Sequence, residues 1–151
     1  MEFSNIGITF GVVLITVVAA IVIYYLVWGV MPGASVMSVT EPPMQNNGLD
    51  DKQAKFIFFY TTWCPWSKKA QQPWASLKEV HKNTPKTYGG TTVIFEEVNA
   101  EVEEGKAALY GIKGYPTFKL ETKDKVYEML GKPSVAAFRA FLITVLGQES
   151  S

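Results

Sequence analysis

The sequence contains only one cysteine, Cys64, and one histidine, His81, among its 151 residues. A single cysteine cannot form a disulfide within the chain. A structural zinc site needs about four cysteine, histidine or carboxylate ligands, so a metal centre within one chain is not expected. We therefore predict no metal and no other cofactor. His81 falls late in a helical pattern, and we interpret it as an ordinary core or edge residue.

Basic residues are absent from the first third of the chain. All 14 lysines and arginines lie from Lys52 onward, and the formal net charge of the whole sequence is zero. No basic stripe or acidic tail is present, so nucleic acid is not an expected partner. A disordered polar chain is also excluded, because 48% of the residues are hydrophobic and 13% are aromatic.

Charge is also absent from residues 6–30, which read IGITFGVVLITVVAAIVIYYLVWGV. About 20 apolar residues cross the hydrocarbon core of a bilayer. A cleaved signal peptide would have a basic start and a shorter apolar stretch. Tyr24, Tyr25 and Trp28 lie near the end of the segment, where aromatic rings suit the headgroup layer. We predict a single transmembrane helix over 6–30, after a tail of 1–5, with the lipid bilayer as a partner.

The segment after the predicted span is rich in proline, glycine, serine and asparagine, which disfavour regular structure. We interpret residues 31–50 as a tether, within which residues 35–40 could pair as a short edge strand. Lys52 and Lys55 are the first positive charges after the span, at the edge of the range over which charge sets orientation. They favour a cytoplasmic C-terminal domain but leave the side of the membrane open.

Cys64 lies between an apolar run and a helical pattern in the segment FIFFYTTWCPWSKKA. The apolar run has the length of a strand that is buried on both faces. Helical spacing follows, so Cys64 should lie at the first turn of a helix with Pro65 just inside its start. The helix N-terminus, with Lys68 and Lys69 one turn further on, should lower the pKa of Cys64. The pattern therefore predicts a nucleophilic thiol.

The rest of the chain alternates between strand and helix patterns. We expect strands at 91–98, 117–121 and 125–130, and helices at 100–110 and from 135 onward, capped by Asn99 and Ser134. The acids Glu101, Glu103 and Glu104 are interpreted as solvent-facing residues at a helix start. This order predicts an α/β fold, a mixed sheet flanked by helices, over residues 51–148 with a tail of 149–151.

Three motifs carry a family resemblance. They are the strand end Tyr-Thr-Thr-Trp-Cys-Pro-Trp-Ser, a helix with Pro73 and Trp74, and the later Gly114-Tyr115-Pro116-Thr117. Together they resemble a thioredoxin-like domain, and the pattern is most like the catalytic domains of protein disulfide isomerases, where Tyr-x-x-Trp-Cys-x-x-Cys-Lys-Lys is typical. The resemblance covers roughly residues 51–147 and implies the thioredoxin-like fold.

The resemblance also implies roles for individual residues. Cys64 matches the exposed attacking cysteine, with Trp63, Pro65 and Trp66 beside it. Tyr115 and Pro116 match a cis peptide bond packed opposite that cysteine, where backbone groups bind an extended peptide by strand addition.

Two positions depart from the family pattern. Ser67 stands where the second, resolving cysteine belongs, and a hydroxyl cannot displace a mixed disulfide. Phe58 stands where the family usually has a buried acid that moves a proton to the resolving cysteine. The resemblance therefore implies a single nucleophile beside a peptide-binding surface.

Two functions from different classes remain open. The first is monothiol disulfide exchange or isomerisation at Cys64, in which net oxidation or reduction would need an outside thiol such as glutathione. The second is a redox-inactive structural or binding subunit of a large membrane-containing assembly, because a fold does not guarantee catalytic activity. One example is a minor capsid or membrane protein in the virion membrane of a large virus. Both predict a protein or peptide partner at the surface of Cys64 and Pro116.

Overall fold

The computed structural model describes residues 15–23, 37–41 and 47–150. Residues 15–23 form a helix whose side chains are exposed. None of the helices in these described ranges combines the length and the hydropathy that a membrane crossing requires. The other residues of the predicted span 6–30 lie outside the described ranges. The chain divides after Ala34, and all the remaining described elements belong to the second unit, Ser35–Ser151.

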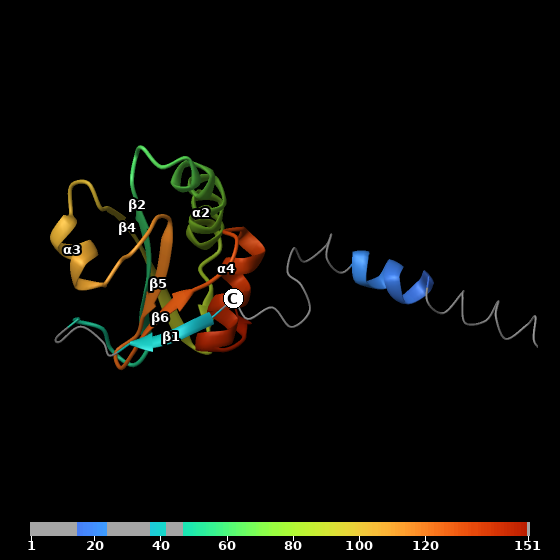
Figure 1. Cartoon of the computed structure of the whole chain (residues 1–151). Helices are drawn as coiled ribbons and strands as arrows, with labels where there is room; N and C mark the ends of the chain where they lie inside the picture. The colour runs from blue at the N-terminus through green and yellow to red at the C-terminus, as the bar shows by residue number, and fades with distance from the viewer. Residues whose placement is uncertain (1–14, 24–36, 42–46, 151) are drawn as a thin grey trace, which may run out of the picture. The chain divides into compact units, whose positions relative to one another are not determined.

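The described part of the second unit forms one seven-stranded mixed sheet in the order β1-β6-β5-β2-β4-β3-β7. Figure 1 labels β1, β2, β4, β5 and β6 of this sheet. Strands β2 and β4 run parallel, and the other neighbouring pairs run antiparallel. The strands are β1 (Met37–Glu41), β2 (Gln53–Tyr60), β3 (Thr87–Tyr88), β4 (Thr91–Asn99), β5 (Thr117–Glu121), β6 (Val126–Met129) and β7 (Glu149–Ser150). The apolar run before Cys64 lies in β2, at the centre of the sheet, as its continuous hydrophobicity predicts.

Helices cover both faces of the sheet. Helices α2 (Pro65–Asn83) and α4 (Val135–Leu146) lie on one face, and the short α3 (Glu104–Leu109) lies on the other (Figure 1). The face under α2 and α4 is hereafter the aromatic face, because its buried core includes Phe56, Phe58, Trp74, Tyr88, Phe118, Phe138 and Phe141. The Phe56 ring alone lies 5.1–6.2 Å, between centroids, from five other aromatic rings.

The face under α3 is hereafter the mixed face. Its apolar cluster is smaller and consists of Ile57, Phe59, Val98, Ala100, Ala107, Tyr110 and Val126. Strand alternation also places two buried charged residues there, Lys119 and Glu121. The Tyr110 hydroxyl donates to Glu121 at 2.7 Å, and Lys119 Nζ lies 3.4 Å from a Glu128 carboxylate oxygen. These buried polar groups are therefore paired, as buried polar groups usually are.

The structure confirms most of the predicted elements and corrects one helix start. The three later strands are present, and Ser134 caps α4 by accepting a hydrogen bond from Ala137 N–H at 3.1 Å. The helix predicted from residue 100 begins only at Glu104. Asn99 is the last residue of β4, where parallel pairing with Tyr60 keeps its backbone extended. Its side chain accepts from Glu101 N–H at 3.0 Å, so it stabilises a turn before the helix.

The sheet also includes segments outside the predicted domain of 51–148. The possible edge strand within the tether is present as β1, which pairs antiparallel with β6. The predicted tail contributes β7, which pairs with β3, a strand absent from the predicted elements. Two-residue strands carry no periodicity, so pattern reading misses them. β7 is instead fixed by its side chain Glu149, which forms ion pairs with Lys86 and Arg139.

Candidate functional site

Cys64 is the N-cap residue of α2, and Pro65 is the first residue of that helix, as predicted. The Lys68 N–H donates to the Cys64 carbonyl at 3.1 Å, which closes the first helical turn. The thiol is 6% exposed, and its S–H donates to the Tyr115 carbonyl oxygen at 3.5 Å. The Tyr115-Pro116 peptide bond is cis, as the resemblance implied. The fold therefore brings together two motifs that lie 51 residues apart.

The pKa of Cys64 is lowered from its ordinary value, as the sequence predicted. The largest cause is the backbone N–H of Ser67, and the Ser67 hydroxyl and the Trp66 N–H act in the same direction against the effect of burial. Donors at a helix N-terminus favour an anion in this way. Lys69, one of the two lysines expected near the thiol, places its ammonium 4.7 Å from the centre of the Trp66 ring.

The two departures from the family pattern are both buried. Ser67 is fully buried, and its hydroxyl oxygen accepts from the Thr61 N–H at 3.4 Å. Phe58 is 1% exposed and stacks on Phe118, with the ring centroids 4.8 Å apart. An aromatic ring in the core therefore occupies the position at which the resemblance implied a buried acid. At that position no side chain is available to move a proton.

The surface around the thiol is apolar and open. Trp63 and Trp66, which flank the buried thiol, are 67% and 62% exposed. Beside them is a hollow of about 420 Å³, hereafter the cis-proline groove, which is lined by Trp66, Lys69, Tyr115, Pro116, Gly131, Lys132 and Pro133. The predicted site residues Trp66, Tyr115 and Pro116 are thus part of one groove.

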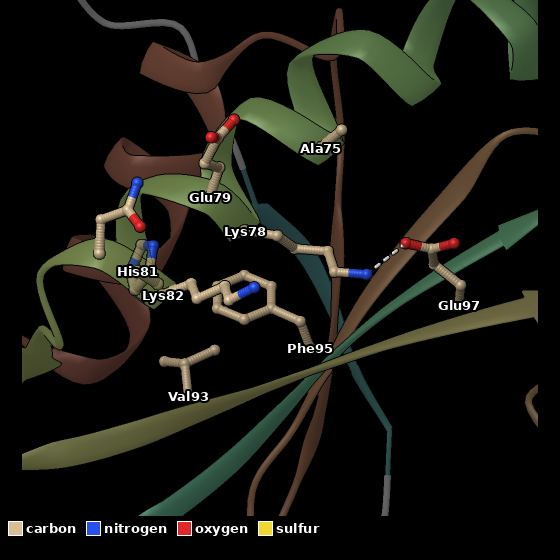
Figure 2. Close-up of a pocket in the computed structure, with 9 residues that line it drawn as sticks. Ala75, Lys78, Glu79, His81, Lys82, Val93, Phe95 and Glu97 are labelled. Atoms are coloured by element: carbon tan, nitrogen blue, oxygen red, sulfur yellow. Dashed lines mark hydrogen bonds and ion pairs between the residues drawn. The ribbon is translucent and has the colours of Figure 1, made fainter.

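A second hollow, of about 580 Å³, is larger but lies away from the thiol (Figure 2). Its lining comes from α2 and β4 and consists of Ala75, Lys78, Glu79, His81, Lys82, Asn83, Val93, Phe95 and Glu97. Lys78 reaches Glu97 across it, with 2.6 Å between Nζ and Oε1. His81 contacts the Leu77 carbonyl through Nδ1 at 2.9 Å and the Tyr88 hydroxyl through Nε2 at 3.1 Å. This hollow does not include the thiol, and Lys78 and Glu97 in its lining are paired with each other, so we place the candidate site at Cys64.

Sequence reasoning missed one residue beside the site. Glu101 is exposed, as predicted, but it also accepts a hydrogen bond from the Thr62 N–H, two residues before Cys64. This backbone hydrogen bond is also the main reason that the pKa of Glu101 is lowered. The parallel pairing of β2 with β4 was the available signal, because the carboxyl ends of parallel strands meet at one edge of a sheet. Within the described ranges, no three His, Cys, Asp or Glu side chains are grouped to hold a metal.

Comparison with known proteins agrees with this geometry. The thioredoxin family model matches residues 36–144. Protein disulfide-isomerase A6 of Mus musculus and of Homo sapiens are 32% and 31% identical to the chain over 88 residues. That match covers 58% of this chain but only 19% of each relative, so the chain corresponds to about a fifth of their length.

Solved structures share the fold. Human ERp44 superposes with a TM-score of 0.53 at 24% identity, covering 66% of this chain and 29% of that one. The first thioredoxin domain of mouse protein disulfide-isomerase A4 gives a TM-score of 0.52 at 21% identity, covering 65% and 66%. The sheet order, the N-cap cysteine and the cis-proline are explained together by one conclusion: the chain belongs to the thioredoxin family.

Proposed function

We propose that this protein carries out thiol–disulfide exchange through one cysteine, Cys64, and is anchored in a membrane by residues 6–30. One observation supports the chemistry above all others. A thiol with a lowered pKa lies at a helix N-terminus, 3.5 Å from the Tyr115 carbonyl that precedes a cis-proline. The similarity to protein disulfide-isomerase A6 supports the same reaction class.

The proposed first step is attack by the Cys64 thiolate on one sulfur of a partner disulfide. A bond forms between Sγ and that sulfur, the partner's S–S bond breaks, and its second sulfur leaves as a thiolate. The Ser67 and Trp66 N–H groups stabilise the attacking thiolate before the step. Tyr115 supplies backbone groups at the same place, which suit the pairing of an extended peptide.

Release of the partner depends on an outside thiolate. Ser67 occupies the position of the resolving cysteine, and its hydroxyl cannot attack the mixed disulfide. A partner thiolate instead attacks the partner sulfur that is bound to Cys64, which forms a new partner disulfide and returns the Cys64 thiolate. The cycle exchanges disulfides without a net change in oxidation state. Net reduction would require a small thiol such as glutathione.

The membrane anchor rests on sequence and on one described helix. Residues 15–23 are helical, and the uncharged run of 6–30 has the length that a bilayer crossing needs. Lys52 and Lys55 favour a cytoplasmic position for the thioredoxin domain. Carbonate extraction at high pH should leave the protein in the membrane pellet. Release of the intact 1–151 chain into the supernatant would contradict the anchor.

A second function, partner binding without chemistry, is favoured by a different observation. Cys64 is only 6% exposed, while Trp63 and Trp66 beside it are largely exposed. Large exposed apolar side chains mark many interaction surfaces. In this case the Trp66 and Tyr115 surface would hold a protein partner, and the thiol would have a packing role. The relatives reported above lend no support to a virion protein.

Trapping of the mixed disulfide separates the two functions. A monothiol that cannot resolve its own intermediate should accumulate adducts when outside thiol is scarce. Acid-quenched protein on a non-reducing gel should show partner bands that disappear with reductant and are absent in Cys64→Ala. A Ser67→Ala variant, which leaves the nucleophile in place, is the matched control and should still form adducts. If wild-type protein forms no adducts and Cys64→Ala retains full function, the binding role is correct instead.

A further inference from the structure

We infer that the cis-proline groove selects partner peptides with an acidic side chain about two residues from the reacting cysteine, on one side only. This inference rests on the proposed exchange at Cys64 and specifies its substrate class. The groove has two cationic side chains, Lys69 and Lys132, and its lining contains no acidic residue. An unbalanced positive charge in a peptide-binding groove favours a negative side chain in the partner.

The two ammonium groups remain available to a partner. Both lysines are exposed, and within the described part of the chain neither forms an ion pair with a carboxylate. Lys69 does contact Trp66, with Nζ 4.7 Å from the ring centroid. A cation–π contact positions the ammonium without neutralising its charge. The indole therefore holds a positive charge at the wall of the groove.

Helix geometry sets the position of the acidic side chain in the partner. Lys69 follows Cys64 by five residues on α2, which corresponds to about 7.5 Å along the helix axis at about 1.5 Å per residue. An extended peptide advances about 3.3 Å per residue, so about two residues span that distance. A carboxylate two residues from the partner cysteine can thus approach Lys69 while the two sulfurs react.

The segment that leads into Cys64 binds a side chain of the opposite charge. Glu101 accepts the hydrogen bond of the Thr62 N–H, on the segment that leads into Cys64. The pKa of Glu101 is lowered, chiefly by that hydrogen bond, so its charged form is the favoured one. The site is therefore positive towards the groove and negative towards the Thr62 segment. An acidic side chain in the partner peptide should therefore favour binding on one side of the partner cysteine and not on the other.

The test uses the 1–151 chain in a non-ionic detergent and extended peptides whose single cysteine is activated with thionitrobenzoate. Attack by Cys64 on the peptide sulfur releases the coloured thionitrobenzoate anion, so the rate is read directly. The peptides carry aspartate or asparagine two residues before or two residues after the cysteine. Aspartate at one position should raise the rate about three- to tenfold at low salt. The gain should shrink in 1 M salt, where screening acts within about 3 Å.

Charge reversal provides the matched comparison. Lys69→Glu with Lys132→Glu should abolish or reverse the preference for aspartate. Lys68→Glu with Lys125→Glu changes the net charge equally, but neither lysine lines the groove, so the preference should persist. Equal rates for aspartate and asparagine peptides would overturn the inference. So would an equal loss of the aspartate preference in the two double variants.

A binding measurement separates this inference from the exchange reaction itself. In Cys64→Ala, fluorescence anisotropy of labelled, non-activated peptides reports binding without any thiol step. A preference for aspartate there supports the charge selectivity even if wild-type protein releases no thionitrobenzoate, a result that would refute only the proposed exchange. Rapid but unselective release, with unselective binding, would leave the exchange standing and refute the selectivity.

Discussion

The two faces of the sheet are built on different principles. The aromatic face, under α2 and α4, is packed with interlocking rings around Phe56 and Trp74. The mixed face, under the short α3, has a small apolar cluster and a buried carboxylate, Glu121, that depends on hydrogen bonds. The helix that carries Cys64 rests on the aromatic face. The helix that begins at the reactive thiol therefore packs on the face with the larger aromatic core.

The largest expected loss of stability comes from truncating one matched core residue on each face. Phe56 and Phe59 lie in the same strand and are both fully buried, but Phe56 points to the aromatic face and Phe59 to the mixed face. Phe56→Ala should lower the free energy of unfolding by about 3–5 kcal/mol, as for large core truncations. Phe59→Ala should lower the free energy of unfolding by less, since the short α3 can relax into the cavity that the ring leaves. Denaturant unfolding measures both, and equal losses would contradict the comparison.

The next largest loss of stability is expected from removing a hydrogen bond to the buried carboxylate of the mixed face. Tyr110→Phe removes the donor that lies 2.7 Å from the buried Glu121 carboxylate. An unsatisfied buried acceptor costs about 1–3 kcal/mol, so the free energy of unfolding should fall by that amount. Tyr127→Phe is the control, because the Tyr127 hydroxyl makes no hydrogen bond within the described residues. Equal stability of the two variants in a urea titration would show that the mixed face does not depend on this bond.

A pH-dependent effect is expected at the edge of the aromatic face, where Tyr88 donates to Glu149 at 3.3 Å. Burial opposes ionisation of Glu149, but hydrogen bonds from Arg139 and Lys86 hold its pKa at about 2. Because this pKa lies below the unfolded value of about 4.3, the stabilisation is present above that value and lost as pH falls through 2. Glu149→Gln should thus cost about 1–2 kcal/mol at pH 7.

That cost should shrink as the pH falls towards 2 and disappear below it, where both proteins carry a neutral side chain at position 149. Thermal unfolding at the two pH values measures the difference. A cost that does not change with pH would mean that Glu149 acts through packing and not through its charge.

The smallest effect concerns the thiol itself. Ser67→Ala removes the side-chain hydrogen bond that helps to lower the pKa of Cys64, while the larger backbone contribution remains. The rate of alkylation by iodoacetamide should reach its plateau at a higher pH, and the rate at pH 7 should fall about two- to fivefold. An unchanged pH profile would mean that the hydroxyl has no electrostatic role at the site.

Much of the fold and of the site was predictable from local patterns. The apolar run of β2, the Cys64-Pro65 helix start and the Ser134 cap each carry their signal within a few residues. The cis bond at Pro116 came from the family resemblance and not from periodicity. These features were predictable because their cause is local or because a motif records it.

Other features depend on contacts between distant segments. The strands β3 and β7 are two residues long, and the Lys86 and Glu149 ion pair that joins them spans 63 residues. The late start of α3 results from parallel pairing of Asn99 with Tyr60, which a helix-capping rule cannot anticipate. Glu101 reaches the Thr62 N–H only because that same pairing aligns the two strand ends. Tertiary contacts therefore decided the cases in which local rules failed.

The order of the sheet has a consequence for synthesis. Its two edges, β1 and β7, are the first and last described strands of the chain. During synthesis, Met37 cannot pair until Met129 has been made, and Tyr88 cannot pair with β7 until Glu149 has been made. An unpaired strand in a growing chain can form hydrogen bonds with a non-native strand. β1 is short, and its register shifts between Ser38 and Thr40, features that make a strand a poor template while its partner is still being made.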